Sequence, residues 1–363
     1  MPRMQPYFAF LVAAITAAIT SILLDVLQDD GESFELGGAL GKIDRVANLS
    51  LEFFNEKYNG RWPVIITDVV ETWEASRWNE AFFMKHYAGD HVTMKLVQGA
   101  LKDASSSFTT LEFFAELKKN GGRPRKWLYV EDEIFIPRRP KLQEDIGTSI
   151  YLQEDFFELF PQEIKPWNAM LLWGTAHSRS ALHIDPYNWT GTNAVIWGKK
   201  RWKLYPPGQD DLLYATSNPN SGFPLNCHKY GSPLDAFDPD LIKYPKFEQA
   251  RALQVQQNPG ELLIIPSGWF HQAFNVRETF AISSQVMNSA NYRVVLTEIA
   301  KAGNFPDSRI PEYLEDLSPS ELVKAAMKMI PQHVIDRGRS VIDVVLSQLY
   351  QHPSMPDFFT PEF

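Results

Sequence analysis

The sequence predicts a mainly β fold with flanking helices, in which the central strands form a β-sandwich, jelly roll or barrel. Short apolar runs separated by Gly and Pro turns fill residues 169–286. Such punctuated runs are typical of antiparallel β architectures. Helical spacing of apolar residues occurs before and after this region, and aromatic residues, which favour strands, make up 13% of the chain. The β core is therefore expected between two helical regions.

The amino-terminal lead-in is predicted to mix helix and strand. Residues 49–58 (LSLEFFNEKY) carry apolar side chains near helical spacing and are followed by an Asn-Gly pair that ends the helix. Residues 62–70 (WPVIITDVV) form a short apolar, β-branched run, which predicts a buried strand. Residues 78–87 again show helical spacing. We therefore expect two short helices with one strand between them.

The centre of the chain predicts a series of strands joined by tight turns. Turn signals such as Pro206-Pro207-Gly208, Pro259-Gly260 and Ser267-Gly268 separate the apolar runs. The predicted strands are residues 169–174, 192–197, 201–205, 261–266, 269–276 and 279–286.

The tail is predicted to be helical. Ser318 and Glu321 form a capping box, and Pro319 stands at the first helical position. A second helix is expected at about 341–349, where the residues are largely apolar. This helix is expected to pack on its neighbour or on a second subunit, so a homodimer through the tail helices is one predicted assembly.

The amino terminus differs in kind from the rest. Residues 7–24 contain no charged residue and reach the lower limit for crossing a bilayer. Arg3 precedes this run and four acidic residues follow it by position 32, which predicts a signal anchor or signal peptide within residues 1–30. The glycine-rich stretch that follows predicts a linker at 31–44. These features predict the secretory-pathway lumen or a single-pass membrane location. The alternatives are a buried apolar helix and a cytoplasmic or nuclear protein.

Composition excludes several functional classes. The chain has 35 Lys and Arg against 44 Asp and Glu, a net charge of −9, and no long basic run. Non-specific nucleic-acid binding needs a basic footprint, so a nucleic-acid partner is not expected. Cys227 is the only cysteine. This excludes an internal disulfide framework and a zinc site built from several thiolates.

Two histidines and one aspartate have the residue types and the spacing of a metal site. His183 and Asp185 stand two residues apart, so on an extended segment both side chains point the same way. His271, in IIPSGWFHQAF, is the candidate for a third ligand. Two His and one carboxylate form the facial triad of non-haem Fe(II) oxygenases, which leaves three positions open for a chelating co-substrate and O2. His177 is the replacement candidate if His271 is not a ligand.

A dicarboxylate co-substrate would leave its own signature, because its far carboxylate needs a cation and hydroxyl groups. Lys200, at the start of a predicted strand in GKKRWKLYPP, is the candidate cation. Asn193 and the hydroxyl groups of Ser283 and Tyr129 are further candidates for the same ligand. The alternative for Lys200 is a solvated hairpin turn.

The segments HIDPYNWTGTNAVIWGKKRWKLYPP and IIPSGWFHQAFNV resemble the jumonji-C (JmjC), cupin-like group of Fe(II)- and 2-oxoglutarate-dependent oxygenases. Within the group, the chain is most similar to the arginine-demethylase and lysyl-hydroxylase branch. The resemblance covers about residues 45–290 and implies a double-stranded β-helix (jelly-roll) core, followed by a helical extension at 291–363. It departs from the branch at Ser283, where Thr is typical, and in the amino-terminal apolar run, which speaks against chromatin and RNA roles.

The resemblance implies roles for seven residues. His183, Asp185 and His271 would bind Fe(II) and form the catalytic centre. The 2-oxoglutarate co-substrate would be held by Lys200, Asn193, Tyr129 and Ser283. The implied reaction is hydroxylation or N-demethylation of Lys or Arg side chains in a polypeptide. The alternatives are another cupin metalloenzyme, such as a sugar isomerase, and a non-catalytic cupin-like lumenal binding protein.

Overall fold

The computed structural model describes residues 39–348 except 100, 102–103, 221–224 and 315. Contacts divide the chain into one unit at residues 1–36 and another at 37–363, and only the second is described. The predicted membrane-targeting run at 7–24, and the predicted linker as far as residue 38, lie outside the described residues. Within the described residues, no helix has both the length and the apolar character that a membrane span requires.

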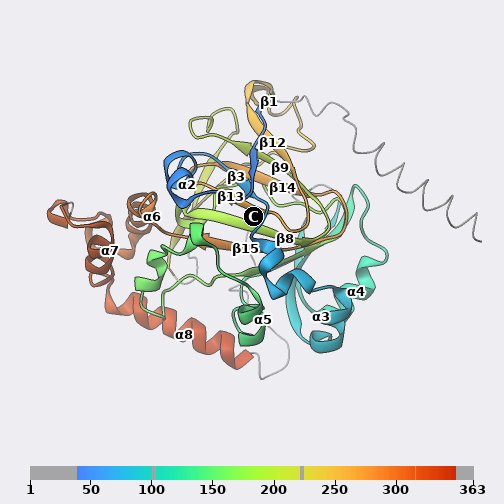
Figure 1. The fold of residues 1–363 in the computed structure, drawn as a ribbon, viewed down its shortest axis with the longest axis horizontal. Coiled ribbons are helices and arrows are strands. Elements are labelled where there is room, and N and C mark those ends of the chain that lie inside the picture. The colour runs from blue at the N-terminus through green and yellow to red at the C-terminus, as the bar shows by residue number, and fades with distance from the viewer. Residues whose placement is uncertain (1–38, 100, 102–103, 221–224, 315, 349–363) are drawn as a thin grey trace, which may run out of the picture. The chain divides into compact units, whose positions relative to one another are not determined.

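Two sheets form the centre of the fold (Figure 1), and β10 and β11 form a separate two-stranded sheet. The large sheet has nine strands in the order β2-β3-β13-β8-β15-β7-β6-β4-β5, and the small sheet has four in the order β1-β12-β9-β14. The strands are β1 (Ala39–Gly41), β2 (Asp44–Val46), β3 (Val64–Ile66), β4 (His91–Gln98), β5 (Ser105–Thr110), β6 (Lys126–Asp132), β7 (Met170–Gly174), β8 (Thr190–Trp197), β9 (Lys200–Tyr205), β10 (Thr216–Asn220), β11 (Cys227–Gly231), β12 (Ala252–Gln257), β13 (Leu262–Ile265), β14 (Phe270–Asn275) and β15 (Thr279–Val286).

Helices precede and follow the strands, as the sequence predicts. The α-helices are α2 (Leu51–Lys57), α3 (Glu80–Tyr87), α4 (Leu111–Lys118), α5 (Pro140–Asp145), α6 (Tyr292–Ile299), α7 (Pro319–Met327) and α8 (Gln332–Gln348). Short 3-10 turns are η1 (Val70–Thr72), η2 (Glu74–Arg77), η4 (Ile150–Leu152), η5 (Phe156–Leu159), η6 (Pro186–Asn188), η7 (Pro245–Gln249), η9 (Pro306–Ser308) and η10 (Glu312–Leu314), and η8 (Ala300–Asn304) is a π turn.

Local chemistry explains where the lead-in helices begin. The side chains of Ser50, Asn79 and Thr110 each accept the backbone N–H of a Phe three residues later. Such N-caps satisfy amide groups that have no partner inside the helix. The capping box predicted at Ser318 and Glu321 is confirmed at the start of α7.

The lead-in helices cover the outer face of the large sheet. One side of each strand packs into an aromatic-rich core with α2, α3 and α4, in which Phe83, Trp173 and Phe280 contact one another. The opposite side faces the interior of the barrel, where Trp127, Tyr129 and the residues around them form a separate apolar cluster. Because strand side chains alternate, residues two apart on these strands share the interior face. The predicted mainly β, jelly-roll architecture is confirmed.

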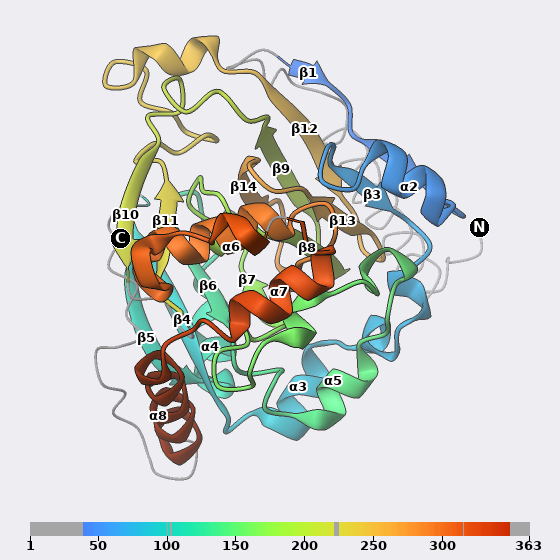
Figure 2. The ribbon, with the colours of Figure 1, turned by 90° about the vertical axis from the view of Figure 1, so that its left-hand side faces the viewer.

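The tail helices α6, α7 and α8 lie together on one side of the strands, which Figure 2 turns toward the viewer. The predicted helix at 341–349 begins earlier than expected, since α8 starts at Gln332. Gly338 looks like a helix breaker in the sequence, but a Cβ there would meet the carbonyl oxygen of Glu163 at 2.1 Å. The glycine thus serves close packing inside a helix. Dimerisation through these helices stays a prediction.

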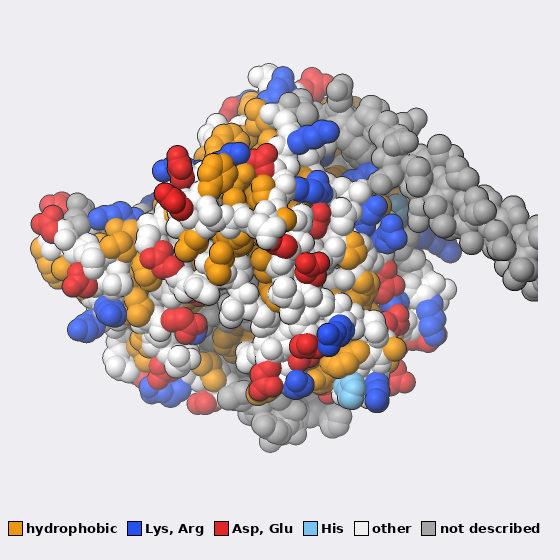
Figure 3. All heavy atoms as spheres, in the orientation of Figure 1, with side chains coloured by type: hydrophobic (Ala, Val, Ile, Leu, Met, Phe, Trp, Pro, Cys, Tyr) orange, Lys and Arg blue, Asp and Glu red, His pale blue; other side chains and the backbone are white. Residues whose placement is uncertain are grey.

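Two further expectations need correction. The strand predicted at 62–70 is limited to β3, because a 3-10 turn, η1, begins at Val70. The strands β1, β2, β4, β5, β6, β10, β11 and β12 are not predicted. Most of them are too short or too polar to read as apolar runs, but β6 (KWLYVED) contains such a run. On the face of the molecule in Figure 3, basic and acidic side chains are interspersed.

Candidate functional site

The two predicted histidine ligands are joined through their backbones. His183 and His271 form an isolated antiparallel bridge, in which each backbone N–H donates to the other's carbonyl oxygen, at 3.1 and 2.8 Å. Residues directly opposite in such a pair project their side chains to the same face. The two imidazole rings accordingly lie side by side, with 4.5 Å between their centroids. Residues 88 positions apart in the sequence therefore meet in one place.

Asp185 is placed by a tight turn. It precedes η6, in which Tyr187 and Asn188 adopt left-handed φ angles of 52° and 56°. Such angles are rare outside glycine. The side-chain oxygen of Asn188 accepts the N–H of Gly268, which ties this turn to the loop before β14. The turn thus brings Asp185 back toward the strand that carries His271.

The three ligand atoms point at a common centre. Oδ1 of Asp185 is 3.6 Å from Nε2 of His183 and 3.6 Å from Nε2 of His271. Metal bonds of about 2.1 Å at right angles hold their donor atoms about 3 Å apart, so the cluster is close to coordination geometry. Among the residues that the structure describes, this is the one group of three or more His, Cys, Asp and Glu side chains able to hold a metal ion.

Hydrogen bonds fix which nitrogen faces the centre. Nδ1 of His183 is 2.8 Å from the carbonyl oxygen of Ala181, and Nδ1 of His271 is 3.0 Å from that of Trp269. A carbonyl oxygen can only accept, so each Nδ1 carries the hydrogen and each Nε2 presents a lone pair. Imidazoles that bind metal are held in this way by a second hydrogen bond.

Electrostatics suit a metal centre. Burial lowers the pKa of His271 to about 4, which keeps this imidazole neutral and able to coordinate. Burial also acts to lower the pKa of His183, but the contact and charge of Asp185 outweigh it and raise that pKa. Burial acts to raise the pKa of Asp185, yet the adjacent histidines lower it overall, so the carboxylate is ionised.

Lys200 lies inside the barrel, where no ion pair among the described residues neutralises its ammonium charge. Its side chain is 1% exposed, and Nζ lies 3.4 Å from the hydroxyl oxygen of Tyr129 and over the ring of Trp202. No carboxylate of the described residues forms an ion pair with it. Burial lowers its pKa to about 7 and raises the pKa of Tyr129 well above the ordinary value. A buried ammonium beside a neutral phenol is a fitting place for an anion.

Asn193 and Ser283 lie opposite each other on β8 and β15. Both lie on the interior face, two residues from Val195 and Ala281 of the interior cluster. Oδ1 of Asn193 is buried without a hydrogen-bond partner among the described residues. The hydroxyl of Ser283 donates to the carbonyl oxygen of Thr192 at 3.0 Å. Both residues therefore offer polar atoms to the interior.

His177 is not part of the metal cluster. Its backbone N–H donates to the carbonyl oxygen of Asn275, and its ring lies against Phe274. Because His271 completes the triad and His177 does not belong to it, the structure gives no reason to use the replacement ligand.

Four site residues were missed by the sequence analysis. A Cβ at Gly191 would come within 2.0 Å of Oδ2 of Asp185, so only glycine leaves room for that carboxylate. A Cβ at Gly174 would come within 2.6 Å of the ring of Tyr129. Lys95 and Glu131 form an ion pair on β4 and β6. Gly174 ends one predicted strand and Gly191 directly precedes another, and a glycine at a strand is the signal that could have marked both.

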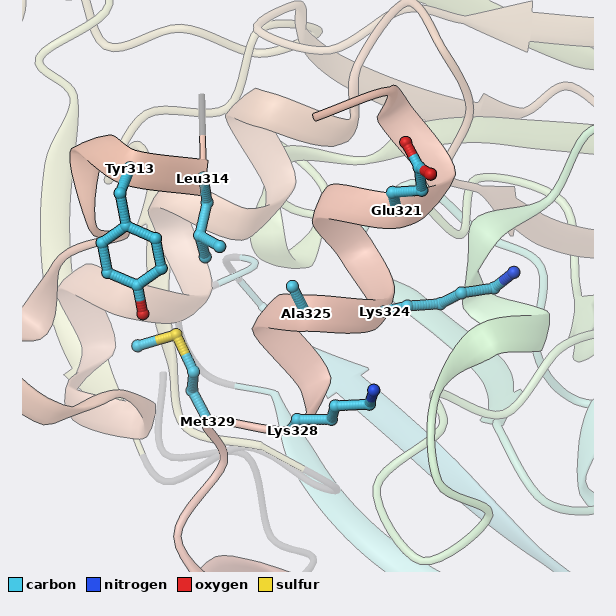
Figure 4. A pocket seen from close by; sticks show the side chains of 7 residues that line it. All are labelled: Tyr313, Leu314, Glu321, Lys324, Ala325, Lys328 and Met329. Carbon is cyan, nitrogen blue, oxygen red and sulfur yellow. The ribbon is translucent and has the colours of Figure 1, made fainter. Parts of the chain in front are cut away.

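A separate hollow lies beside α7 and shares no residue with this site (Figure 4). It is lined by Tyr313, Leu314, Glu321, Lys324, Ala325, Lys328 and Met329.

Comparison with known proteins places the chain in a family. Residues 50–293 match the sequence pattern of the cupin-like domain family. The lysine-specific demethylase JMJ21 of Arabidopsis thaliana is 27% identical over 278 residues, which are 75% of this chain and 28% of that protein. The bifunctional arginine demethylase and lysyl-hydroxylase psr-1 of Caenorhabditis elegans is 26% identical over 319 residues, 85% of this chain and 77% of that protein.

A third relative is named for its co-substrate and metal. The 2-oxoglutarate and iron-dependent oxygenase JMJD4 of Gallus gallus is 29% identical over 191 residues, which are 51% of this chain and 42% of that protein. The chain thus spans less than half the length of two of these relatives. The predicted resemblance to the JmjC, cupin-like group is confirmed. Since the family match covers well over half of its residues, the chain belongs to the cupin-like domain family.

Proposed function

We propose that the protein is an Fe(II)- and 2-oxoglutarate-dependent oxygenase. The observation that carries this proposal is the presence, inside one barrel, of a His-Asp-His cluster and of a buried Lys200 that forms no ion pair among the described residues. The first suits a facially coordinated metal, and the second suits the far carboxylate of a dicarboxylate. One of the relatives is named as a 2-oxoglutarate and iron-dependent oxygenase, which supports the same function.

Each residue has a distinct part in this proposal. His183, Asp185 and His271 hold the metal from one side and leave its other side open to ligands. Lys200 binds the far carboxylate by charge, and Tyr129 donates a hydrogen bond to it because its phenol stays protonated. The metal with 2-oxoglutarate and O2 supplies the oxidising power for insertion of oxygen into a C–H bond.

Asn193 and Ser283 complete the co-substrate site. The Nδ2 group of Asn193 can donate to an oxygen of the ligand, and Oδ1, which has no hydrogen-bond partner among the described residues, can accept from a donor of the ligand or a water. The Ser283 hydroxyl must turn away from Thr192 before it can donate to the ligand. We therefore assign Ser283 a smaller share of the binding free energy than Lys200.

For the substrate, we propose a Lys or Arg side chain within a polypeptide. Relatives are named as lysine-specific demethylase and as arginine demethylase and lysyl-hydroxylase, which supports this class. The net charge of −9 also favours an encounter with basic segments. Hydroxylation and N-demethylation share the same first oxidation of a C–H bond, so the same site serves either outcome.

The alternative metalloenzyme, a sugar isomerase, would use a metal cluster but would have no need of Lys200. A non-catalytic binding protein would need neither the cluster nor Lys200. The deciding measurement is succinate release from 2-oxoglutarate with Fe(II) in air, together with a visible charge-transfer band from the same mixture without oxygen. We expect both, and wild-type protein that shows neither would contradict the proposal.

We further propose that residues 7–24 direct the chain to a membrane of the secretory pathway and that residues 45–290 form the catalytic domain. The support for targeting is the charge-free run with Arg3 before it and acidic residues after it. The full chain should then fractionate with membranes, and its tail should resist protease in sealed vesicles. A protease-accessible tail on a chain that stays out of the membrane fraction would favour the cytoplasmic or nuclear alternative.

A further inference from the structure

A partly buried ion pair lies beside the co-substrate site. Lys95 of β4 and Glu131 of β6 contact each other, and their side chains are only 15% and 22% exposed. In the register of these strands Lys95 stands opposite Tyr129, whose ring lies in the interior cluster. Residues directly opposite share a face, so the pair lies on the interior wall of the barrel. The metal cluster and the residues assigned to 2-oxoglutarate so far do not account for it.

Glu131 is the acidic group whose charge acts on Lys200. It follows Tyr129 by two residues on β6, so the two side chains are neighbours about 7 Å apart along the same face. The hydroxyl of Tyr129 in turn contacts Nζ of Lys200. The other elements around Lys200 present uncharged groups: Trp202 of β9 lies under Nζ, and Asn275 of β14 and Gln257 of β12 pair with Lys200 in register.

The charge of Glu131 opposes the effect of burial on Lys200. Burial disfavours the ammonium form and lowers the pKa of Lys200 to about 7, and the negative charge of Glu131 acts to raise it. A carboxylate at this position also repels a dianionic ligand, but Lys95 compensates for that charge. The pair therefore adds little net charge to the compartment, and Glu131 is the member of the pair whose charge acts on Lys200.

We propose that Glu131, held in place by Lys95, is a positioning residue of the co-substrate site that keeps Lys200 in its ammonium form, ready for the far carboxylate of 2-oxoglutarate. This inference rests on the proposed function and deepens it. Lys200 is the group that touches the ligand, and Glu131 acts through it.

The sign of the pH dependence follows from this role. Only the ammonium form of Lys200 attracts the carboxylate, so binding is strongest below the pKa of Lys200 and weakens about tenfold per pH unit above it. With that pKa at about 7, wild-type protein should bind 2-oxoglutarate about tenfold more weakly at pH 8 than at pH 6. Removal of the negative charge at Glu131 lowers the pKa further, so the weakening begins at a lower pH.

The test is calorimetric titration of the full chain, loaded with Mn(II), with 2-oxoglutarate at pH 6, 7 and 8. For Glu131→Gln, we expect the ratio of its Kd to the wild-type Kd to rise by about three- to tenfold between pH 6 and pH 8. Glu131→Asp retains the charge and should restore the wild-type profile. Glu52→Gln, which removes an exposed acid on α2, is the control and should give a constant ratio.

Two outcomes would contradict the inference in different ways. A ratio for Glu131→Gln that is the same at every pH would mean that the pair is only structural, and the inference alone would fail. Wild-type protein that binds Mn(II) but no 2-oxoglutarate at any pH would overturn the proposed function, and the inference with it. Lys95→Gln gives an independent measurement. The uncompensated carboxylate should weaken 2-oxoglutarate binding at pH 6, where Lys200 is already charged, and should weaken it less at pH 8, where it raises the pKa of Lys200. A loss of binding that grows with pH would contradict the inference.

Discussion

The metal end and the co-substrate end of the barrel are built by different means. At the metal end, His183 and Asp185 lie outside the regular strands, in an isolated bridge and a turn with left-handed residues. At the co-substrate end, Tyr129, Asn193 and Lys200 lie within β6, β8 and β9, and strand register alone places them on the interior face. The metal end depends on irregular backbone, and the co-substrate end depends on the alternation of side chains along regular strands.

This difference predicts how each end should respond to substitution. The metal end is a set of ligands that act as one unit, so the loss of any member, or of the space it occupies, should remove the whole function. The co-substrate end is a set of separate polar contacts, so its residues should contribute unequal and smaller amounts. Substitutions at both ends, taken from the largest expected effect to the smallest, test this difference.

The largest effect is expected for Asp185→Ala. The change leaves two imidazoles without the carboxylate that neutralises the metal charge. Changes that only disturb the groups around a ligand cost about 10–100-fold in metal affinity, so loss of a ligand should reduce succinate release by more than about a hundredfold. The measurement is Fe(II)-dependent succinate release, paired with Mn(II) titration. Asp211→Ala, which removes an exposed carboxylate, should match wild type, and metal affinity retained by Asp185→Ala would contradict the triad.

A smaller loss of metal affinity is expected for Gly191→Ala. The added Cβ would overlap Oδ2 of Asp185, which must then leave its position. We expect metal affinity to fall by about 10–100-fold, as for other changes that disturb a ligand's surroundings. Gly89→Ala is the control, because nothing lies within 4 Å of a Cβ there. Equal Mn(II) affinity in both variants would mean that the carboxylate tolerates displacement.

Lys200→Ala should weaken co-substrate binding without weakening metal binding. Removal of a charge-assisted contact costs about 1.5–3 kcal/mol, so the Kd for 2-oxoglutarate should rise roughly ten- to a hundredfold. Mn(II) affinity should stay near the wild-type value, because Lys200 makes no contact with the triad side chains in the described structure. An unchanged Kd would show that another cation binds the far carboxylate, and Lys199→Ala, at the adjacent residue, would be the next variant.

The contrast between the two ends also explains what the sequence could predict. The six central strands were located within about two residues, because their apolar runs and turns are local signals. The HxD pair and Lys200 were found from spacing and residue type. The bridge between His183 and His271 and the placement of Glu131 beside Lys200 depend on strand register, which is a property of pairing and not of a single segment.

Missed elements have equally physical reasons. The strands β5 (SSSFTT) and β12 (ALQVQQ) carry mostly polar residues, because their stability comes from ladder hydrogen bonds and neighbouring strands. The alternation in β4 (HVTMKLVQ) was a usable signal, and it would have placed Lys95 on the face opposite Met94. Gly191 was overlooked because its role lies in the space that it leaves for Asp185.

The smallest effect is expected for Ser283→Ala. The Ser283 hydroxyl has a single donor hydrogen, and in the structure that hydrogen is directed to the carbonyl oxygen of Thr192. Binding of a carboxylate exchanges this hydrogen bond for another, so the net gain is that of one neutral donor, about 0.5–1.5 kcal/mol. The Kd for 2-oxoglutarate should rise by about two- to tenfold, measured by calorimetry with Mn(II). Ser283→Thr keeps the hydroxyl and should bind like wild type. A loss as large as that of Lys200→Ala would mean that the polar contacts of the co-substrate end act as one unit, and the contrast with the metal end would not hold.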